Sequence, residues 1–452
     1  MSAPFVPHTE EEIGEMLAFL GLSSLDELFS TVPAALRLAG GLDLPRQQSE
    51  ADVVHRLEVL GTRNRPVGRS LVCFAGAGAY DHEVPAVVRS LASRSEFMTA
   101  YTPYQPEVSQ GVLQAIFEYQ TMVARLSGLE IANGSLYDGA ASLVEGVNLA
   151  VAATGNSKIL LSGGVNPRWR AVLSTFSKGS GHELISVPLT DGITDFNDAA
   201  ATDSAQVGAV VIAFPNFLGC LEDVAAARSV ADRTGARLVV CFDPVAAGLL
   251  KTPGSLGADV VVGEGQGLGT PLGYGGPYLG LFACHASDVR RLPGRLVGET
   301  VDIEDRRAYV ATLRAREQDI RREKASSNVC TNQTLMAVTA AIQLGWLGTV
   351  GLREVALRSA RAARYTREAL TAIDGVEPAA GAPVLREFAV RLPVPAELAI
   401  DRLVEEGYLA GVAVREGYEG TDVEGTLLVA ATERRTREEI DGFAASLEKV
   451  VR

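Results

Sequence analysis

The sequence predicts an α/β protein with a mostly parallel, doubly wound large domain and a small α+β domain at the C-terminus. Three observations support this fold class. Apolar runs of strand length recur between residues 158 and 283, with helical patterns between them. A charged, arginine-rich segment follows at about residues 285–325. Beyond it, the patterns of a smaller domain continue to the C-terminus, and 452 residues are too many for one simple core.

Residues 1–66 are expected to form a helical arm. Thr9 and Glu12 have the spacing of a capping box, an apolar stripe follows them, and Gly21 is the expected end of that helix. A second short helix is expected between Ser24 and Pro33. An arm of this kind more often packs against a neighbour or joins subunits than carries a site.

The large domain is expected to span residues 67–325. Its loops at residues 70–110 are rich in glycine, proline and tyrosine, which suggests the walls of a site. The segment NGSLYDG precedes an apolar helix whose N-terminus suits either an anion or a plain buried cap. Ligands of doubly wound sheets bind at the carboxyl ends of the strands. Strands are predicted at residues 158–162, 183–189, 207–216, 237–243, 258–263 and 278–283, and helices at 111–129, 140–153, 167–178 and 222–234.

The C-terminal part changes in character. The charged segment at residues 285–325 is predicted to contain a helix and a connector, and residues 326–452 are expected to form the small α+β domain. Further helices are predicted at residues 333–347, 352–372, 397–406 and 437–450, and strands at 385–392, 410–415 and 426–432.

Composition excludes several classes of partner. The formal net charge of −14 argues against nucleic acid and against an anionic membrane surface. No stretch has the roughly 18 consecutive apolar residues of a membrane helix, and the N-terminus has no apolar signal core. The five cysteines form no C-x-x-C pair, so we expect reduced thiols and a cytoplasmic protein.

Several kinds of chemistry lack their motifs. The glycines between residues 263 and 269 do not have G-x-G-x-x-G spacing, and neither a phosphate-binding G-x-x-x-x-G-K-[ST] loop nor a G-x-S-x-G elbow is present. None of the five histidines has a second histidine or a cysteine at helical spacing, so no metal site is expected. NAD-linked, serine-hydrolase and metal-dependent chemistry are therefore disfavoured.

One stretch, residues 236–280, has a pattern typical of pyridoxal-phosphate (PLP) enzymes of the aspartate-aminotransferase type. A strand ends in Asp243, and a second strand leads into a glycine-rich loop. In such enzymes the aspartate pairs with the pyridine nitrogen and a lysine of the later loop binds the cofactor covalently. The chain has lysine only at positions 158, 178, 251, 324 and 449, none of them in that loop. The sequence thus predicts this fold with a degenerate PLP site.

Motifs along nearly the whole chain resemble one family, the P-proteins of the glycine cleavage system, in the branch formed by the α subunit (subunit 1). The matching stretches are PHTEEEIGEML, FAGAGAYDHEVPAVV, EFMTAYTPYQPEVSQGVLQAIFEYQTM, NGSLYDGAAS, PNFLGCLED, GEGQGLGTPLGYGGPYLG and REQDIRREKASSNVCTNQTL.

The resemblance implies an α2β2 enzyme that decarboxylates glycine on PLP held by the β subunit and passes the aminomethyl group to the lipoyl arm of the H-protein. In the family the PLP lysine precedes a Thr-Pro pair, which places Gln266 at or next to that position. The implied α chain binds no cofactor covalently and has no catalytic residue of its own. Asp243 and Gln266 would be vestiges of the cofactor site.

We expect eight residues to line a surface shared with the β subunit or a channel for the lipoyl arm, and internal packing is an equally weighted interpretation for each. They are His82, Tyr101, Thr102, Tyr104, Ser326, Ser327, Asn328 and Cys330. Two other functions stay open. The chain could be a non-catalytic scaffold or regulatory paralogue of a PLP enzyme, or a stand-alone PLP enzyme that uses an unexpected lysine.

Overall fold

The computed structural model describes residues 7–38, 42–99, 103–197 and 206–452. The chain divides into two compact units, residues 1–65 and 66–452, each of which is described by itself. The further division of the second unit at residues 325 and 326 stays a prediction.

The N-terminal unit contains helices α1 (Glu10–Leu20) and α2 (Glu50–Gly61) and two short 3-10 turns (Leu25–Phe29 and Ala34–Leu36). Its first helix begins as the sequence predicts, because the side chains of Thr9 and Glu12 cap each other's backbone N–H groups. None of its described residues is buried, and large apolar side chains stand in solvent, such as Phe19 at 90% and Leu36 at 76% exposure. This unit therefore has no hydrophobic core of its own.

The main sheet lies in the second unit. Within the described residues its strand order is β2-β10-β9-β8-β7-β3-β4, with β10 antiparallel to both neighbours and the other pairings parallel. The mostly parallel sheet predicted from the sequence is confirmed. The strands are β2 (Ile131–Ala132), β3 (Lys158–Ser162), β4 (Glu183–Val187), β7 (Val207–Phe214), β8 (Arg237–Phe242), β9 (Val260–Glu264) and β10 (Gly280–Cys284).

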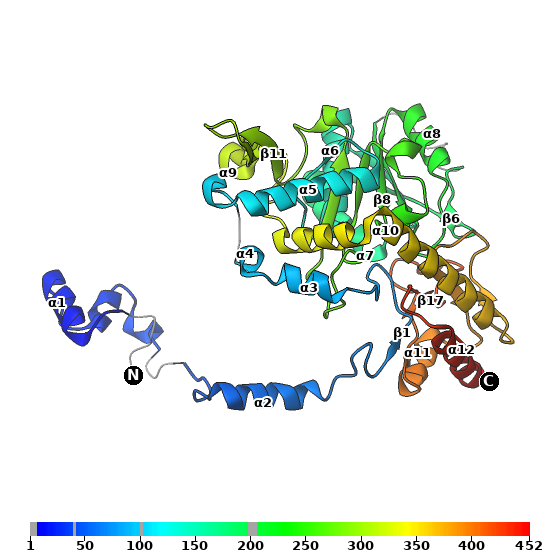
Figure 1. The fold of residues 1–452 in the computed structure, drawn as a ribbon, viewed down its shortest axis with the longest axis horizontal. Coiled ribbons are helices and arrows are strands. Elements are labelled where there is room, and N and C mark those ends of the chain that lie inside the picture. Colours follow the sequence, from blue (N-terminus) through cyan, green and yellow to red (C-terminus); the bar gives the residue numbers. More distant parts are fainter. Residues whose placement is uncertain (1–6, 39–41, 100–102, 198–205) are drawn as a thin grey trace. The chain divides into compact units, whose positions relative to one another are not determined.

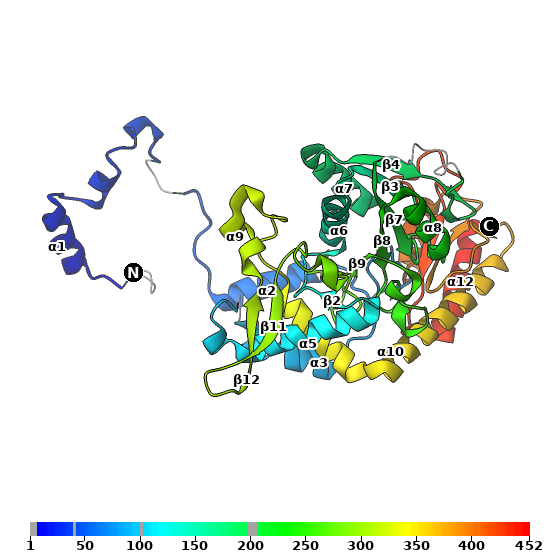
Figure 2. The same cartoon turned by 90° about the horizontal axis from the view of Figure 1, so that it is seen from above.

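Helices cover both faces of this sheet, because alternate residues of each strand point to opposite sides. Val210 and Ile212 join a core with α5 (Gln110–Ser127), α8 (Val224–Thr234) and α10 (Thr334–Thr371). Their neighbours Ala209 and Val211 join a second core with α6 (Gly139–Thr154) and α7 (Pro167–Ser180). Figure 2 shows the three layers, with the sheet between α6 and α7 on one side and α5 and α10 on the other.

The long helix α10 combines the two helices predicted at residues 333–347 and 352–372. They meet at Gly348, whose φ of 59° is non-helical. By length and hydropathy alone this helix could cross a membrane. However, Ala337, Ala340 and Leu344 pack in the core beneath the sheet, as expected for a core helix.

A smaller antiparallel sheet lies towards the C-terminus (Figure 1). Its strand order is β13-β14-β17-β16, and α11 and α12 pack with it around a core that includes Val390, Leu427 and Phe443. A short parallel pair, β1 and β15, adjoins it. The bounds are β1 (Val72–Cys73), β13 (Glu377–Pro378), β14 (Glu387–Arg391), α11 (Ala396–Glu405), β15 (Tyr408–Leu409), β16 (Val412–Ala413), β17 (Leu427–Ala430) and α12 (Arg437–Val451).

The prediction of a helix in residues 285–325 is largely wrong. A β-hairpin, β11 (Leu296–Val301) and β12 (Arg307–Thr312), occupies most of the segment, and α9 (Gln318–Arg321) is only one turn long. Buried Val297 and Tyr309 hold the hairpin against α5. The many arginines obscured this strand pattern in the sequence. The remaining elements are α3 (Ala86–Ala92), α4 (Ser95–Met98), β5 (Leu189–Thr190) and β6 (Ile193–Thr194).

Candidate functional site

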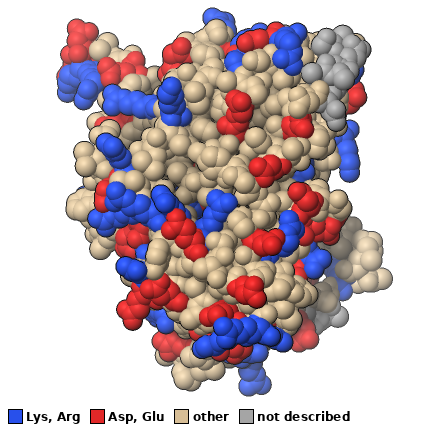
Figure 3. Space-filling view, turned by 90° about the vertical axis from the view of Figure 1, so that its right-hand side faces the viewer, with Lys and Arg blue, Asp and Glu red and all other residues tan. Residues whose placement is uncertain are grey.

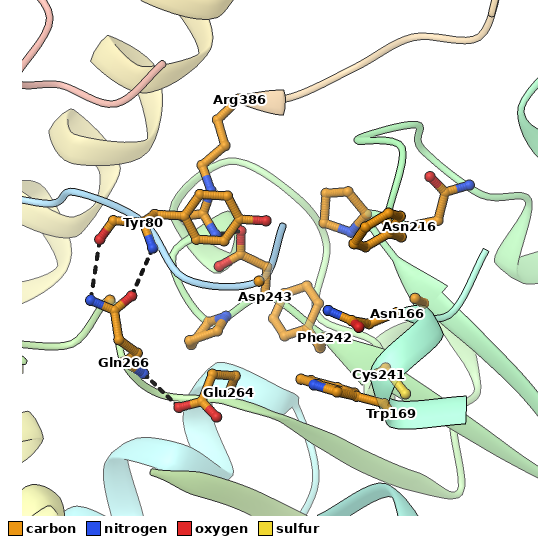
Figure 4. A pocket seen from close by; sticks show the side chains of 16 residues that line it. Tyr80, Asn166, Trp169, Asn216, Cys241, Phe242, Asp243, Glu264, Gln266 and Arg386 are labelled. Carbon is orange, nitrogen blue, oxygen red and sulfur yellow. Dashed lines mark hydrogen bonds and ion pairs between the residues drawn. The ribbon is translucent and has the colours of Figure 1, made fainter. Parts of the chain in front are cut away.

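A cavity of about 80 Å³ lies at the carboxyl ends of β7, β8 and β9 (Figure 4). This is the position at which doubly wound sheets bind ligands. The strands contribute Asp243 and Glu264 directly, and the loop after β9 contributes Gln266. Tyr80 lies on the loop before α3. Arg386 is the residue directly before β14 of the smaller sheet. We call this cavity the strand-end pocket.

Asp243 is paired within the chain. Its Oδ2 lies 2.7 Å from Nη2 of Arg386, and its Oδ1 accepts a hydrogen bond from the Val245 N–H at 3.0 Å. The Arg386 side chain is 7% exposed. Burial lowers the pKa of this guanidinium, but the charge of Asp243 and the other neighbouring groups together outweigh burial and raise it. Arg386 therefore stays charged, and the carboxylate expected to meet a pyridine nitrogen meets an arginine.

Arg386 also connects the pocket to His82. Its Nη1 donates to Nε2 of His82 at 2.6 Å, so the other ring nitrogen, Nδ1, donates to the Glu433 carboxylate at 2.7 Å. Although burial raises the pKa of Glu433, its hydrogen bond with His82 lowers it to about 2. The guanidinium lies 3.5 Å from the centre of the Tyr80 ring. One arginine thus holds together residues from three separate segments.

Glu387, the residue after Arg386 and the first residue of β14, is buried and accepts two hydrogen bonds. Its carboxylate accepts hydrogen bonds from the Ala77 N–H at 2.6 Å and from the Tyr80 hydroxyl at 2.7 Å. Burial raises the pKa of Glu387 to about 7, against the effect of those two donors. Two neighbouring residues therefore fasten the loop that carries Tyr80 and His82, Glu387 through the Ala77 N–H and the Tyr80 hydroxyl and Arg386 through the His82 ring.

Gln266 occupies the position at which the resemblance places the lysine. Its Oε1 accepts from the Tyr80 N–H at 2.9 Å, and its Nε2 donates to the carbonyls of Tyr80 at 3.2 Å and Thr270 at 2.7 Å. The side chain is 1% exposed. Figure 4 shows it directed at the Tyr80 backbone and not into the cavity. This buried amide therefore has a structural role, because it connects the loop after β9 to the backbone of Tyr80.

Glu264, at the end of β9, occupies the N-terminus of α6. One carboxylate oxygen accepts from the Gly139 N–H at 2.9 Å, and the other accepts from the Gln266 N–H at 3.0 Å and the Leu279 N–H at 2.9 Å. Burial raises the pKa of Glu264 to about 7, against the effect of these donors. Of the two interpretations of the NGSLYDG segment, the structure shows the capped, buried helix, because the Asp138 side chain accepts the Ala141 N–H at 2.7 Å and Glu264 of the same chain accepts the Gly139 N–H.

These residues do not fit a PLP molecule. The position at which the resemblance places the lysine holds the Gln266 amide, Asp243 is paired with Arg386, and Glu264 accepts the Gly139 N–H at the start of α6. The cavity of about 80 Å³ is far below the ~300–1,000 Å³ of typical small-molecule sites. A wider groove of about 410 Å³ adjoins it, and Trp169 and Glu264 line both cavities.

The residues predicted to share a surface with a partner lie in several different surroundings. His82 is 5% exposed and belongs to the network of the strand-end pocket. Tyr104 and Cys330 meet at Arg295, which donates to the Tyr104 hydroxyl at 2.7 Å and to the Cys330 carbonyl at 3.0 Å. Ser327 hydrogen-bonds Glu145 of α6. Ser326, Asn328 and the Cys330 side chain face solvent, whereas Tyr101 and Thr102 lie outside the described residues.

Sequence reasoning missed the residues that close the pocket from the smaller sheet. Arg386, Glu387 and Glu433 lie more than 140 residues beyond Asp243 in the chain, where only secondary structure was predicted. A signal was nevertheless present. Arg386 and Glu387 stand side by side at the start of the strand LREFAVRL, and adjacent opposite charges in a buried strand need partners.

Comparison with known proteins agrees with this geometry. A family model described as "Glycine cleavage system P-protein" matches residues 3–447. Two similar relatives are each described as a probable glycine dehydrogenase (decarboxylating) subunit 1. The one from Moorella thermoacetica is 47% identical over 447 residues, and the one from Chlorobium chlorochromatii is 46% identical over 445. The alignments cover 98–99% of this chain and 99% of each relative.

Solved structures extend the comparison. A glycine decarboxylase (P-protein) of the glycine cleavage system, in inhibitor-bound form, is 46% identical and superposes with a TM-score of 0.91 over 99% of this chain and all of that one. A Burkholderia pseudomallei sphingosine-1-phosphate lyase, at 16% identity and a TM-score of 0.61 over 93% of this chain and 94% of that one, shares the fold alone. The predicted PLP-type fold is confirmed, and the chain belongs to the glycine cleavage system P-protein family.

Proposed function

We propose that this chain is the α subunit, subunit 1, of a two-subunit glycine decarboxylase, and that a β subunit holds the PLP. The complex decarboxylates glycine and passes the aminomethyl group to the lipoyl arm of the H-protein. The observation that carries this proposal is the strand-end pocket. Its three cofactor-facing positions, Asp243, Glu264 and Gln266, are each engaged by groups of the same chain.

The relatives support the division of labour. Both carry the description "subunit 1", and each aligns with this chain over 99% of its own length. A protein with such a description implies a second subunit. In the proposed α2β2 assembly the β subunit alone carries the PLP lysine. This explains why a full-length member of the family has no amine in the loop after β9.

The role of this chain is then to shape the β site and its approaches. We assign Tyr104, Ser326, Ser327, Asn328 and Cys330 to the surface shared with β or with the lipoyl arm, together with Tyr101 and Thr102, which precede Tyr104 in the sequence. The side chains of Ser326, Asn328 and Cys330 are available to a partner because they face solvent. His82 is buried, and we assign it to positioning the loop that precedes α3.

The charge distribution supports a protein partner over nucleic acid. On the face seen in Figure 3, acidic and basic side chains are interspersed, and neither sign forms a continuous patch. The net charge of −14 is also unfavourable for phosphate backbones. The described thiols of Cys73, Cys220, Cys241 and Cys284 are free and buried, which suits the reducing cytoplasm.

One preparation tests the proposal. The purified chain is mixed with PLP and treated with borohydride, and peptide mapping follows any adduct. The cognate β subunit and H-protein are then added, and the exchange of bicarbonate with the glycine carboxyl group is measured. We expect no stoichiometric adduct on any of Lys158, Lys178, Lys251, Lys324 and Lys449, and exchange only in the mixture.

The other outcomes contradict the proposal in different ways. A specific adduct on one lysine of the folded chain identifies a stand-alone PLP enzyme. Exchange by β and H-protein at the same rate with or without this chain identifies a scaffold or regulatory paralogue. The absence of exchange both with and without this chain points to the same interpretation.

A further inference from the structure

We propose that a separate cavity, which we call the arginine pocket, binds a phosphate group, either as the free ion or as part of a small phosphate ester. The cavity has a volume of about 260 Å³ and shares no lining residue with the strand-end pocket. It lies in the second unit, where β1, the residue before β15 and the first turn of α12 come together (Figure 1). The proposed function does not use this cavity, so the two proposals stand or fall separately. Its polar side chains are those of Arg69, Ser70, Arg434, Arg435 and Glu439.

One wall of the arginine pocket is a tight turn at residues 66–71. Backbone hydrogen bonds close it, from the Gly68 N–H to the Leu71 carbonyl at 2.9 Å and from the Ser70 N–H to the Pro66 carbonyl at 2.9 Å. Gly68 has a φ of 80°, a conformation that favours glycine. The turn places Arg69 and Ser70 at the cavity, and both are exposed. Neither side chain has a hydrogen bond or an ion pair with any residue that the structure describes, so both are free to bind a ligand.

Arg434, from the segment between β17 and α12, brings a second guanidinium to the same turn. Its Nη1 donates to Oδ1 of Asp81 at 3.1 Å, and its Nε lies 3.5 Å from Oε2 of Glu83. Its Nη2 has no partner within the described part of the chain. A Cβ placed on Gly68 would lie 3.7 Å from this nitrogen. The unused edge of the Arg434 guanidinium is therefore directly beside the turn that carries Arg69 and Ser70.

Arg435 adds a buried positive charge to the lining. Its side chain is 4% exposed, its Nη2 donates to Oδ2 of Asp81 at 3.1 Å, and its Nη1 lies 3.7 Å from Oε2 of Glu439. Its Nε is also buried and has no hydrogen-bond partner among the described residues. Buried polar groups are normally hydrogen-bonded. A buried guanidinium with an unused donor in the lining of a cavity favours a ligand that is rich in acceptor atoms.

The charges of the lining favour an oxyanion. Three arginines and one carboxylate line the cavity, so its charge is positive although the chain has a formal net charge of −14. The carboxylate, that of Glu439, already accepts the Thr436 N–H at 2.9 Å. The carboxylates that pair with Arg434 and Arg435 leave Arg69 without one. Guanidinium groups and a hydroxyl with free donors suit a phosphate group, which offers several charged acceptor oxygens.

The test is the binding of phosphate to the full chain. Thermal unfolding is measured in increasing inorganic phosphate at about pH 8, where phosphate is mainly dianionic, with sodium chloride added to keep the ionic strength constant. We expect the Tm of the wild type to rise in a saturable manner, by about 1–2 °C over chloride alone. The titration is repeated with glycerol 3-phosphate. A larger rise with the ester identifies an ester as the ligand, whereas a rise with inorganic phosphate alone identifies the free ion.

Two variants change the phosphate response in opposite directions. Arg69→Gln removes the unpaired guanidinium, so it should abolish most of the response. Glu439→Gln removes the only carboxylate of the lining, so it should strengthen the apparent affinity for phosphate by about three- to tenfold. Glutamine also serves at this position of the capping box of α12. A purely structural role of these side chains would not increase the response to phosphate. Arg364→Gln is the matched control, because Arg364 pairs with Glu368 on the surface of α10, and it should keep the full response.

Three results would overturn the proposal. The first is a wild type whose Tm in phosphate equals that in chloride of the same ionic strength. The second is a response of Arg69→Gln equal to that of the wild type. The third is a response to malonate, a dicarboxylate without phosphate, as large as the response to phosphate. If Glu439→Gln does not fold, Arg69→Lys takes its place. It keeps the positive charge and should therefore retain more of the response than Arg69→Gln, and equal loss in both would contradict the site.

Discussion

The strand-end pocket and the N-terminal unit of residues 1–65 place their side chains in opposite environments. In the pocket, Asp243, Glu264 and Gln266 have partners within the chain and little contact with solvent. In the N-terminal unit no described residue is buried, and apolar side chains such as Phe19 face solvent. In the region that resembles a catalytic site, the polar side chains thus have their partners within the chain. In the region that resembles a simple arm, the apolar side chains are not buried. The contrast indicates that this chain acts through its surfaces.

Deletion of residues 1–65 should have the largest effect on the complex. Burial of a large apolar side chain contributes about 1.5–3 kcal/mol, so loss of even two, such as Phe19 and Leu36, weakens association by about 100-fold or more. We expect the truncated chain to fold, because residues 66–452 contain the hydrophobic cores, but to fail to assemble with the β subunit. Sedimentation of the mixture measures this.

A milder pair of variants serves as the control. Phe19→Ser should weaken assembly, whereas Glu15→Ser on the same helix should not, because Glu15 adds charge and no apolar area. If the truncated chain assembled normally with the β subunit, the exposed apolar side chains of residues 1–65 would not be needed for assembly, which would contradict the contrast drawn above.

Arg386→Ala should have the next largest effect, on stability. It leaves Asp243 without its charge partner and removes the stacking on Tyr80. Breaking a buried ion pair costs about 3–5 kcal/mol. Equilibrium denaturation of the full chain measures the change, and Arg364→Ala is the matched control. Arg364 pairs with Glu368 on the surface of α10, with 81% of its side chain exposed, and should change the free energy of unfolding by at most about 0.5 kcal/mol. Similar losses in both variants would contradict the buried role of Arg386.

Glu387→Gln should change how stability depends on pH. Burial raises the pKa of Glu387 from the ordinary 4.5 to about 7, and the group faces Arg386, Asp243 and Tyr80. Its contribution is fully present below pH 4.5 and is lost as the pH rises through about 7.

Glutamine keeps the bonds to Ala77 and Tyr80 but does not titrate. Relative to the wild type, the variant should therefore gain about 2–3 kcal/mol of stability between pH 4.5 and pH 8, which denaturation at several pH values detects. A stability difference that stays constant over this range would contradict the buried, protonatable carboxyl.

Thr9→Ala should have the smallest effect. It removes the capping box of α1, at a cost of about 1 kcal/mol to that helix. Because residues 1–65 form a separate unit, hydrogen exchange should accelerate in residues 10–20 alone, and the Tm of the remaining chain should not change. Faster exchange in β8 or β9 would show that the arm supports the sheet.

The sequence predicted the sheet better than the site, for physical reasons. Strand β7 is buried throughout and β8 is buried from Leu238 onward, so their sequences are continuous apolar runs, and a polar residue, Asp243, follows the end of β8. The identity of Gln266 could also be read directly from the loop. Arg386 and Glu433 could not be placed, because their partners are far away in sequence and neither belongs to a local motif. The hairpin β11–β12 was missed because its exposed arginines mask the alternation of Val297 and Tyr309.

The bonds of Arg386 have a mechanical consequence. Arg386 and Glu387 lie at the start of β14 in the smaller sheet, and Glu433 lies between β17 and α12. Asp243 directly follows β8 of the main sheet, and Tyr80 and His82 lie on the loop before α3. Separating the two sheets would expose a buried charge at every one of these contacts simultaneously. A cleft that can close around a ligand needs a hinge, but in this chain these contacts connect the two sheets and fix their relative position. The His82 loop is therefore held to both sheets by one set of contacts, and it cannot move unless several of them break together.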